Sequence, residues 1–279
     1  MKREEFNYKN GYTHGGVFHA DDVFATALLK MLNPDIQIER GFTPPQDDGE
    51  TIVYDIGHGK YDHHQQDSEI RDDEERTPYS SVGLIWREFG MNLCVDEKVW
   101  EIVDAQLIKD IDYTDNTGVQ NPMSFTIKCM NGDNPEKDFE SAVDFATKVL
   151  SLILKKTTDN FKEEERINYL AESAKGGVLV LDEYMPMGGL GMNAKVGVVV
   201  YPSQRGGYNV HCIRHDETAG INNVAFPAEL GGAEIDRLKL FDPSLTFVHK
   251  GLFIGATTDL KSAVRVAHEI VARSGWTNH

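Results

Sequence analysis

The stretch THGGVFHADDVFATALLKML, residues 13–32, joins a polar turn to a long apolar run. Residues 23–32 are nearly all apolar, as is typical of a buried helix, and Asp21 and Asp22 fall in its first turn, where the helix dipole favours acidic side chains. The turn before them holds two histidines and two glycines. The stretch is therefore either a metal-binding strand-to-helix turn or an ordinary polar loop. Matching ligands elsewhere in the chain must decide between the two.

The composition favours a globular protein that binds divalent metal. The chain has 279 residues, 40% of them hydrophobic, and a net charge of −17 from 28 basic and 45 acidic side chains. This length suits one large domain or two modest ones. The overall field repels a long polyanion, so contact with nucleic acid requires a local basic groove or bound cations.

Cysteine usage and hydropathy exclude several classes of protein. Cys94, Cys129 and Cys212 lie far apart, so we interpret them as small hydrophobic residues and not as a disulfide framework or a zinc site. No apolar run approaches the roughly 18 residues of a membrane span. The N-terminus lacks the apolar core of a signal peptide. We therefore expect a cytoplasmic protein with no membrane partner.

The first half of the chain alternates strand and helix patterns. The alternation predicts strands at 36–40 and 51–57, and helices at 80–90 and from residue 99 toward 112. Such alternation predicts an α/β fold, with a mostly parallel sheet and flanking helices.

The second half has a different character. Residues 136–175 are helical throughout, and closely spaced strands follow at 177–184, 195–202, 208–215 and 245–251, before a final helix that begins near Asp259. We predict an N-terminal metal-binding domain (1–135), a helical connector (136–175) and a smaller C-terminal α+β domain (176–279). The boundary can fall anywhere from about 135 to 176.

Histidines and aspartates concentrate at the predicted strand ends. Five of the ten histidines lie within residues 14–64. Loops at the carboxyl ends of neighbouring strands converge on the ligand site of an open α/β sheet. Three segments compete for that position: His14, His19 and Asp21 in the first turn, Asp55 at the end of a strand, and Asp62, His63 and His64 just after it. Imidazole and carboxylate without cysteine suit Mn²⁺, Mg²⁺, Fe²⁺ or Zn²⁺, and one carboxylate between two ligand sets could bridge two cations.

A fourth acidic segment, KDIDYTDN, occupies residues 109–116. Asp110 and Asp112 point to nearly opposite sides of a helix, so at most one of them is expected to be a ligand. Asp112 and Asp115 could face the same way as a ligand and its supporting partner. Asp22 and Asp115 are explained equally well as helix-start and turn residues.

The order of these segments resembles a known superfamily. A His-rich first turn, a strand-end Asp55, the Asp-His-His at 62–64 and the later Asp112 resemble the DHH phosphoesterases, which include RecJ-type exonucleases, small-oligonucleotide phosphodiesterases and type-II inorganic pyrophosphatases. The segments HGGVFHADD, DIGHGKYDHHQQD, YSSVGLIWREFG and DYTDNTG resemble the MYG family more closely. Its members are described as metal-dependent hydrolases, and a eukaryotic member is regarded as a 3′-to-5′ RNA exonuclease.

The resemblance implies roles for individual residues. The superfamily's first motif is usually His-x3-Asp-x-Asp, whereas this chain has His14-x4-His19-x-Asp21, which leaves the division of ligands between two metals open. Asp55 would bridge the metals, His64 would contact substrate phosphate or act as an acid, and Asp62 would orient the histidines. The implied metal ligands are His14, His19, Asp21, Asp55, His63 and Asp112.

The C-terminal half resembles the superfamily less closely. His249 and Gly251–Gly255 resemble the glycine- and histidine-containing motif through which the second superfamily domain contacts substrate. Arg205, Arg214 and Lys250 are candidate substrate contacts by charge alone. We expect RNA, a short oligonucleotide or a nucleotide as the substrate, and the oligomeric state stays open, a homo-oligomer included.

The resemblance predicts a hydrolase of phosphodiester bonds, a 3′-to-5′ exonuclease that uses two divalent cations, with Mn²⁺ expected and Mg²⁺ or another divalent cation as alternatives. A phosphatase of small phosphoanhydrides or nucleotides is a second hypothesis. The altered first motif supports a third, a regulatory protein that binds metal or nucleotide without turnover. A single structural metal is a fourth.

Overall fold

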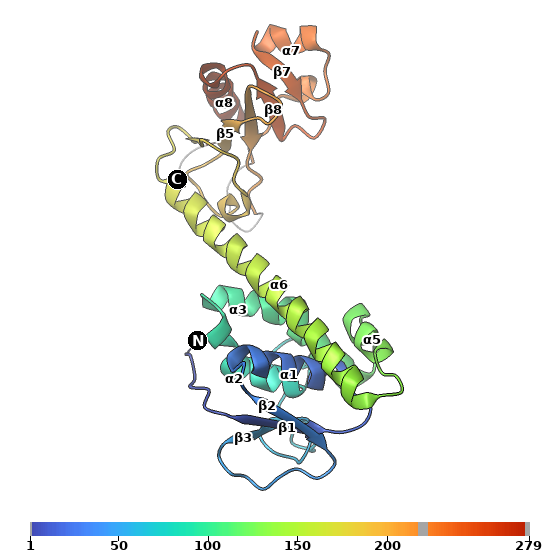
Figure 1. The fold of residues 1–279 in the computed structure, drawn as a ribbon. Helices are drawn as coiled ribbons and strands as arrows, with labels where there is room; N and C mark the ends of the chain where they lie inside the picture. The colour runs from blue at the N-terminus through green and yellow to red at the C-terminus, as the bar shows by residue number, and fades with distance from the viewer. Residues whose placement is uncertain (1, 217–222, 277–279) are drawn as a thin grey trace. The chain divides into compact units, whose positions relative to one another are not determined.

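The structure, a computed structural model, describes residues 2–216 and 223–276. The chain divides into two compact units, Met1–Asp159 and Asn160–His279. The long helix α6, Pro135–Ala171, contributes residues to both units (Figure 1). The division therefore falls inside the segment that the sequence assigns to a helical connector.

A three-stranded parallel sheet organises the N-terminal unit. Strand β1, Asn10–His14, lies between β2, Gln37–Gly41, and β3, Thr51–Val53. Because β1 and β3 are parallel and in register, both strands end at the same edge of the sheet. The segments that follow them are thereby brought together, as expected for an open α/β sheet.

Helices cover this sheet. Helix α1, Ala20–Leu32, packs against α2, Ser81–Phe89, and both lie on one side of the sheet in Figure 1. Large side chains of α1 and α2, including Phe24, Leu28 and Trp86, are fully buried. The remaining helices of the unit, besides α6, are α3 (Glu97–Val103), α4 (Lys109–Thr117), α5 (Pro122–Cys129) and the short turns η1 (Gly90–Leu93) and η2 (Asp104–Ile108), the latter a π-helix. The predicted α/β fold is confirmed.

The central strand β1 is absent from the sequence-based prediction. Its residues, NGYTH, carry no run of β-branched or alternating apolar side chains. Tyr12 and Thr13 are nevertheless buried, because β1 pairs on both edges and helices cover the sheet. Tertiary packing here overrides local propensity.

A five-stranded mixed sheet, with strand order β4-β5-β6-β8-β7, forms the C-terminal unit. Helix α8, Leu260–Ser274, packs against one face of it, and Asp259 caps the helix where the sequence predicts its start. Only the β4–β5 pair is parallel. The strands are β4 (Val178–Val180), β5 (Val198–Pro202), β6 (Tyr208–Cys212), β7 (Leu245–Val248) and β8 (Ile254–Thr257). Strand β8, helix α7 (Ile235–Phe241) and the short turns η3 (Gly188–Leu190) and η5 (Ala228–Leu230) are further elements that the sequence did not predict.

The two faces of this second sheet are packed differently. Val198, Val200 and Val210 point toward α8 and join its apolar side chains in one core. On the other face, Leu179 and Val199 pack against the end of α6. That second core covers the β4–β5 side of the sheet.

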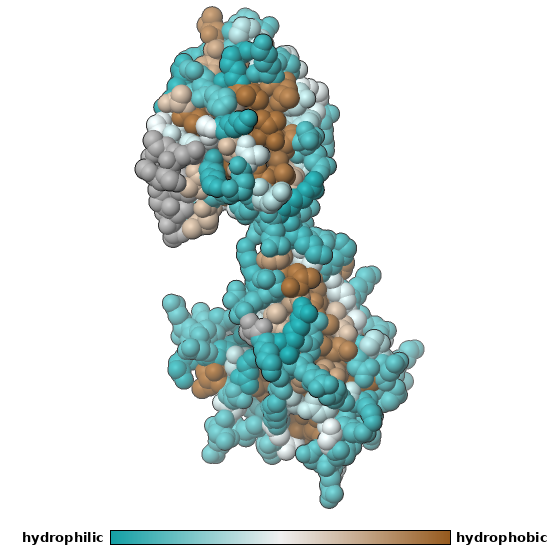
Figure 2. Space-filling model, turned by 90° about the vertical axis from the view of Figure 1, so that its left-hand side faces the viewer, coloured by the Kyte–Doolittle hydropathy of each residue, from teal (hydrophilic) through white to brown (hydrophobic). Residues whose placement is uncertain are grey.

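Hydrophilic side chains cover most of the molecular surface on the face drawn in Figure 2, with a larger apolar area on the C-terminal unit. No helix in the described part of the chain is both long and apolar enough to cross a membrane.

A buried ion pair links several elements of the N-terminal unit. Arg71 Nε donates to Asp112 Oδ2 at 2.7 Å, and its Nη1 donates to Asp104 Oδ2 at 2.6 Å. The guanidinium carbon also lies 4.6 Å from the centre of the Tyr79 ring. Asp112 on α4 is fully buried, so removing its cation would leave an uncompensated charge in the core.

Arg71→Met is expected to lower the free energy of unfolding of the N-terminal unit by about 3–5 kcal/mol, because Asp112 would lose its buried partner. Urea titration monitored by tryptophan fluorescence measures this, since Trp86 and Trp100 lie in this unit. Arg87→Met is the matched control, because Arg87 contacts the same Tyr79 ring but its ion pair with Glu69 is exposed and is worth about 0–1 kcal/mol. An equal loss of unfolding free energy in Arg71→Met and Arg87→Met would contradict the conclusion that Arg71 compensates the buried charge of Asp112.

Candidate metal centre

The turn between β1 and α1 is held by two side chains from elsewhere in the fold. Arg40 Nη2 donates to the carbonyl of Gly16 at 3.0 Å. Asn131 accepts from the Phe18 amide and donates to the Phe18 carbonyl, each at 3.0 Å. Gly16 has a φ of 82°, which only glycine adopts without strain. The turn that carries the two histidines is thus fixed in position.

Helix α1 begins directly after this turn. The backbone amide of His19 donates to Asp22 Oδ1 at 2.8 Å, so Asp22 caps the helix. The other oxygen of Asp22 lies 3.3 Å from His14 Nε2. One short helix start therefore fixes a carboxylate beside an imidazole that comes from β1.

Asp55 lies at the centre of the site. It follows β3 in the left-handed region, with a φ of 56°, and its amide donates to the Tyr61 carbonyl at 3.1 Å. Its Oδ2 is 3.2 Å from His14 Nε2 and its Oδ1 is 3.2 Å from His63 Nε2. A non-glycine residue in this region is uncommon and is concentrated at functional sites.

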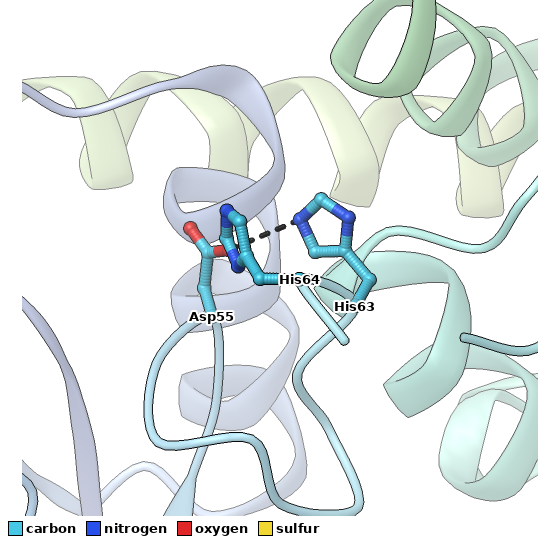
Figure 3. A group of neighbouring side chains, drawn as sticks. All are labelled: Asp55, His63 and His64. Atoms are coloured by element: carbon cyan, nitrogen blue, oxygen red, sulfur yellow. Dashed lines mark hydrogen bonds and ion pairs between the residues drawn. The ribbon is translucent and has the colours of Figure 1, made fainter. Parts of the chain in front are cut away.

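Three sets of side chains in the described residues could each hold a metal ion. Within each set, the candidate ligand atoms lie within 4.8 Å of one another. Asp55 belongs to two of the sets, and Figure 3 shows its carboxylate facing the rings of His63 and His64. The sets are His14, Asp22 and Asp55; Asp55, His63 and His64; and His19, Asp21 and Asp115.

The pKa shifts at the site reflect an excess of buried carboxylates over cations. Burial alone would lower the pKa of His14, but the carboxylates of Asp55 and Asp22 raise it to about 9. Burial raises the pKa of Asp22 to about 7, although His14 opposes the shift. Burial and the charges of Asp55 and Asp115 raise the pKa of Asp21 well above its usual range. Asp55 behaves differently, because hydrogen bonds from His14 and His63 outweigh its burial and hold its pKa below the usual range.

The donor set fits a divalent cation. Both carboxylate oxygens of Asp21 and the Oδ2 of Asp22 are buried without a hydrogen-bond partner among the described residues. Buried carboxylates are costly unless they are paired, protonated or bound to metal. Oxygen and imidazole ligands without cysteine suit Mn²⁺, Mg²⁺, Fe²⁺ or Zn²⁺.

His64 is held differently from the other histidines. Its Nδ1 lies 2.6 Å from Asp62 Oδ1, and Asp62 Oδ2 accepts from the His58 amide at 2.7 Å. The side chain of His64 is 55% exposed, and it lines a surface hollow together with His14, His19 and Asp55. Asp62 thus fixes the His64 ring on its Nδ1 side, and the opposite edge of the ring faces solvent.

The structure brings most of the predicted ligands together but not Asp112. The Asp112 carboxylate accepts from the amide and hydroxyl of Ser80 and from Arg71, so it serves the core of the unit. Asp112 is therefore not among the candidate metal sets of the described residues, and its predicted role as a ligand stays a prediction. Asp115, one turn further along α4, lies 3.1 Å from His63 Nε2 and takes its place in the candidate ligand set.

Asp22 is a second ligand candidate that the sequence did not single out, because its role as a helix cap explained it equally well. It performs both roles, with one oxygen as the cap and the other toward His14. The spacing His14-x7-Asp22, read together with Asp55, is the signal that could have identified it.

The predicted substrate contacts of the second half lie in the C-terminal unit. Arg205, Arg214, His249 and Lys250 are all exposed. Their role toward substrate stays a prediction.

A family comparison now identifies the group of proteins to which these residues belong. The family model named MYG1 exonuclease, described as an uncharacterised protein family (UPF0160), matches residues 12–271. The chain belongs to this family. The resemblance to the MYG family is thereby confirmed, and the match includes both the candidate metal sets and the C-terminal sheet.

Curated relatives cover nearly the whole chain. The MYG1 exonuclease of Homo sapiens is 23% identical over 323 aligned residues, which cover 95% of this chain and 86% of the human protein. A MYG1 protein of Schizosaccharomyces pombe is 24% identical, with 92% of this chain and 95% of the relative covered. The MYG1 exonuclease of Rattus norvegicus is 22% identical, with 94% and 84% covered.

Binding of Mn²⁺ is expected to release protons and to strengthen as pH rises. At pH 7 the metal-free site holds protons on His14, whose pKa is about 9, and partly on Asp22, whose pKa is about 7. A cation displaces them, so affinity should rise from pH 6 to 9 by about tenfold per pH unit for each proton released. Titration calorimetry in buffers of different ionisation enthalpy measures both quantities.

Asp35→Asn, which alters an exposed carboxylate outside the site, should keep the same pH dependence. An affinity for Mn²⁺ that does not change with pH would contradict the assigned ligands.

Proposed function

We propose that this protein is a metal-dependent hydrolase of phosphodiester bonds that acts as a 3′-to-5′ exonuclease on RNA or short oligonucleotides. The observation that carries the proposal is Asp55, whose two oxygens face different imidazoles, His14 and His63, and which belongs to two candidate metal sets. A shared carboxylate is the arrangement that holds two cations close together.

The proposed cofactor is a pair of divalent cations, with Mn²⁺ as the expected metal and DHH phosphoesterases as the expected superfamily. When bound, such a pair would activate water and neutralise charge on the phosphoryl group. His14, Asp22 and Asp55 would hold one cation, and His63 with Asp55 would contribute to the other. His19, Asp21 and Asp115 offer further ligands, and the carboxylates of Asp21 and Asp115 lie 3.6 and 3.1 Å from the same His63 Nε2 that faces Asp55.

We assign His64 the task of contacting a phosphate group of the substrate. This phosphate is either the one that water attacks or the one that leaves with the product. The Asp62 carboxylate fixes the Nδ1 proton on the inner edge of the ring, so Nε2 faces the hollow. Burial would raise the pKa of Asp62, but hydrogen bonds from His64 and His58 lower it, so Asp62 stays ionised near neutral pH. A protonated His64 can then donate from Nε2 to phosphate, and a neutral one can accept a proton there.

The names of the relatives support a nucleic-acid substrate. Mammalian relatives carry the name MYG1 exonuclease, and the identity of 22–23% to them leaves substrate and direction of digestion as part of the proposal. The chain's net charge of −17 favours short single strands over long duplexes, because repulsion grows with the number of phosphates in contact.

Asp55→Asn should abolish RNA digestion, with a loss of at least about 10³-fold in kcat/KM, because removing a central charged group from a preorganised site costs several kcal/mol. The assay uses single-stranded RNA labelled at its 5′ end, Mn²⁺, and a denaturing gel that resolves single-nucleotide steps. Asp35→Asn is the control.

A ladder that shortens from the 3′ end supports the proposal. Full activity of Asp55→Asn, or of the wild type in excess chelator, contradicts it. Release of phosphate from pyrophosphate or nucleotides without any shortening of RNA would support the phosphatase hypothesis instead. Tight Mn²⁺ binding without turnover of any of these substrates would support a regulatory protein.

Asp62→Asn should lower kcat by about 10- to 100-fold, because an amide no longer fixes the ring of His64. Mn²⁺ affinity should change little, since Asp62 belongs to none of the candidate metal sets. Calorimetry and single-turnover kinetics on the same preparation separate the two effects. A loss of metal binding in this variant would contradict the assignment of His64 to phosphate and would place Asp62 or His64, which belongs to one candidate set, at the metal.

A further inference from the structure

A continuous series of ring contacts crosses one face of the C-terminal sheet. The centroids of Tyr201 and His211 are 6.3 Å apart, and those of His211 and Phe253 are 5.7 Å apart. The contacts continue to His249 at 4.6 Å and on to Phe247 at 6.4 Å. At the other end, Tyr184 contacts Tyr201 at 5.4 Å. We call this set the aromatic row: Tyr184, Tyr201, His211, Phe253, His249 and Phe247.

The register of the strands explains why these rings share a face. Val200 on β5 and Val210 on β6 point toward α8, so their neighbours Tyr201 and His211 point to the opposite side. His211 pairs with Ile254 on β8, and Phe253, which directly precedes this strand, has its ring 5.7 Å from that of His211. Tyr201 and His211 therefore lie on the sheet face opposite α8, and the other rings of the aromatic row are placed by their contacts with these two and with one another.

The turn between β7 and β8 fixes two of the rings. The amide of Gly251 donates to His249 Nδ1 at 2.9 Å, which leaves the His249 proton on Nε2 when the ring is neutral. The amide of Leu252 donates to the His249 carbonyl at 2.9 Å, and the carbonyl of Phe253 accepts from Cys212 at 2.8 Å. These backbone hydrogen bonds hold His249 and Phe253 as neighbouring rings, so their positions do not depend on other side chains packing over them.

These rings are accessible to a partner. Tyr184 is 59% exposed, Phe247 is 47% exposed and Phe253 is 42% exposed. Tyr201 is buried beneath this layer and supports it. Burial lowers the pKa of His211, so its ring is neutral at pH 7 and behaves as an uncharged aromatic surface. Several large rings exposed side by side are uncommon on a surface without a binding role.

Two hollows beside the aromatic row carry positive charge, in contrast to the net negative charge of the chain. Within the described residues that line them, the only charged side chain is an arginine in each. One hollow contains Arg214 beside His211 and Phe253, and the other contains Arg205 beside Tyr201 and Phe247. In a chain of net charge −17, two hollows whose described lining residues include an arginine each and no carboxylate favour an anionic ligand that also has flat apolar parts.

We propose that the aromatic row binds the bases of single-stranded RNA by stacking, while Arg205 and Arg214 contact its phosphates. Single-stranded nucleic acid combines flat bases with a regular anionic backbone, and proteins bind it through aromatic rings flanked by cations. The proposal rests on the proposed nuclease function for the identity of the ligand, and it assigns the C-terminal unit the task of holding the strand that is digested.

The test measures binding separately from cleavage. Fluorescence anisotropy with a fluorescein-labelled single-stranded RNA is recorded on the full-length protein in EDTA, where metal-dependent cleavage cannot occur. Phe253→Leu and Phe247→Leu should each raise Kd by about 5- to 100-fold, the range for loss of one stacked base. Phe253→Tyr keeps an aromatic ring and should retain the wild-type Kd. That result would show that the loss of affinity in Phe253→Leu comes from the missing ring and not from misfolding of the turn.

Two controls separate stacking from charge and from hydrophobicity in general. Tyr169→Leu removes a ring that is 79% exposed on α6, outside the row, and should leave Kd unchanged. An abasic oligonucleotide of equal length should bind more weakly to the wild type, and its Kd should not respond to Phe253→Leu.

The outcomes distinguish this inference from the proposed function. Digestion of RNA in Mn²⁺ together with unchanged Kd in the row variants would overturn the inference and leave the function standing. Weaker binding in the row variants of a protein that digests nothing would support the inference while the nuclease function fails. A changed sedimentation coefficient in Phe253→Leu with unchanged RNA affinity would assign the face to a second copy of the chain and overturn the inference.

Discussion

The N-terminal unit depends on one electrostatic constraint, the burial of several carboxylates at the end of a short parallel sheet. Asp21, Asp22 and Asp55 are all buried within reach of one another's charge. Without positive charge such a cluster opposes folding, because each carboxylate loses its hydration and repels the others. His14 and His63 supply part of that charge, and a divalent cation would supply the rest. The turn before α1 and the left-handed backbone at Asp55 are the local features that keep these groups together.

Much of this arrangement could be predicted because it follows local rules. The apolar run of α1, the acidic residues at its start and the strand that ends before Asp55 place ligands at one sheet edge through topology alone. Asp62-His63-His64 follows that strand closely enough that it must return to the same edge. His14, His19, Asp21, Asp55 and His63 all lie among the three candidate metal sets of the structure.

The features that the sequence does not indicate depend on distant partners. Whether Asp112 or Asp115 faces the site depends on the rotation of α4, and Arg71, whose partner the sequence does not reveal, draws Asp112 into the core. Strand β1 is polar in composition and becomes central only because it pairs on both edges. The aromatic row likewise draws its rings from four segments, so no single motif indicates it. When the position of a side chain depends on partners distant in the sequence, the local sequence pattern does not predict it.

The central claim is that Asp55 bridges two divalent cations. Anomalous diffraction at the manganese edge, from crystals grown with Mn²⁺, tests it most directly. Two anomalous peaks that share Asp55 as a ligand are expected, one beside His14 and Asp22 and one beside His63. A single peak that does not contact Asp55, or no peak at this cluster in a well-diffracting crystal with Mn²⁺ in excess, would contradict it.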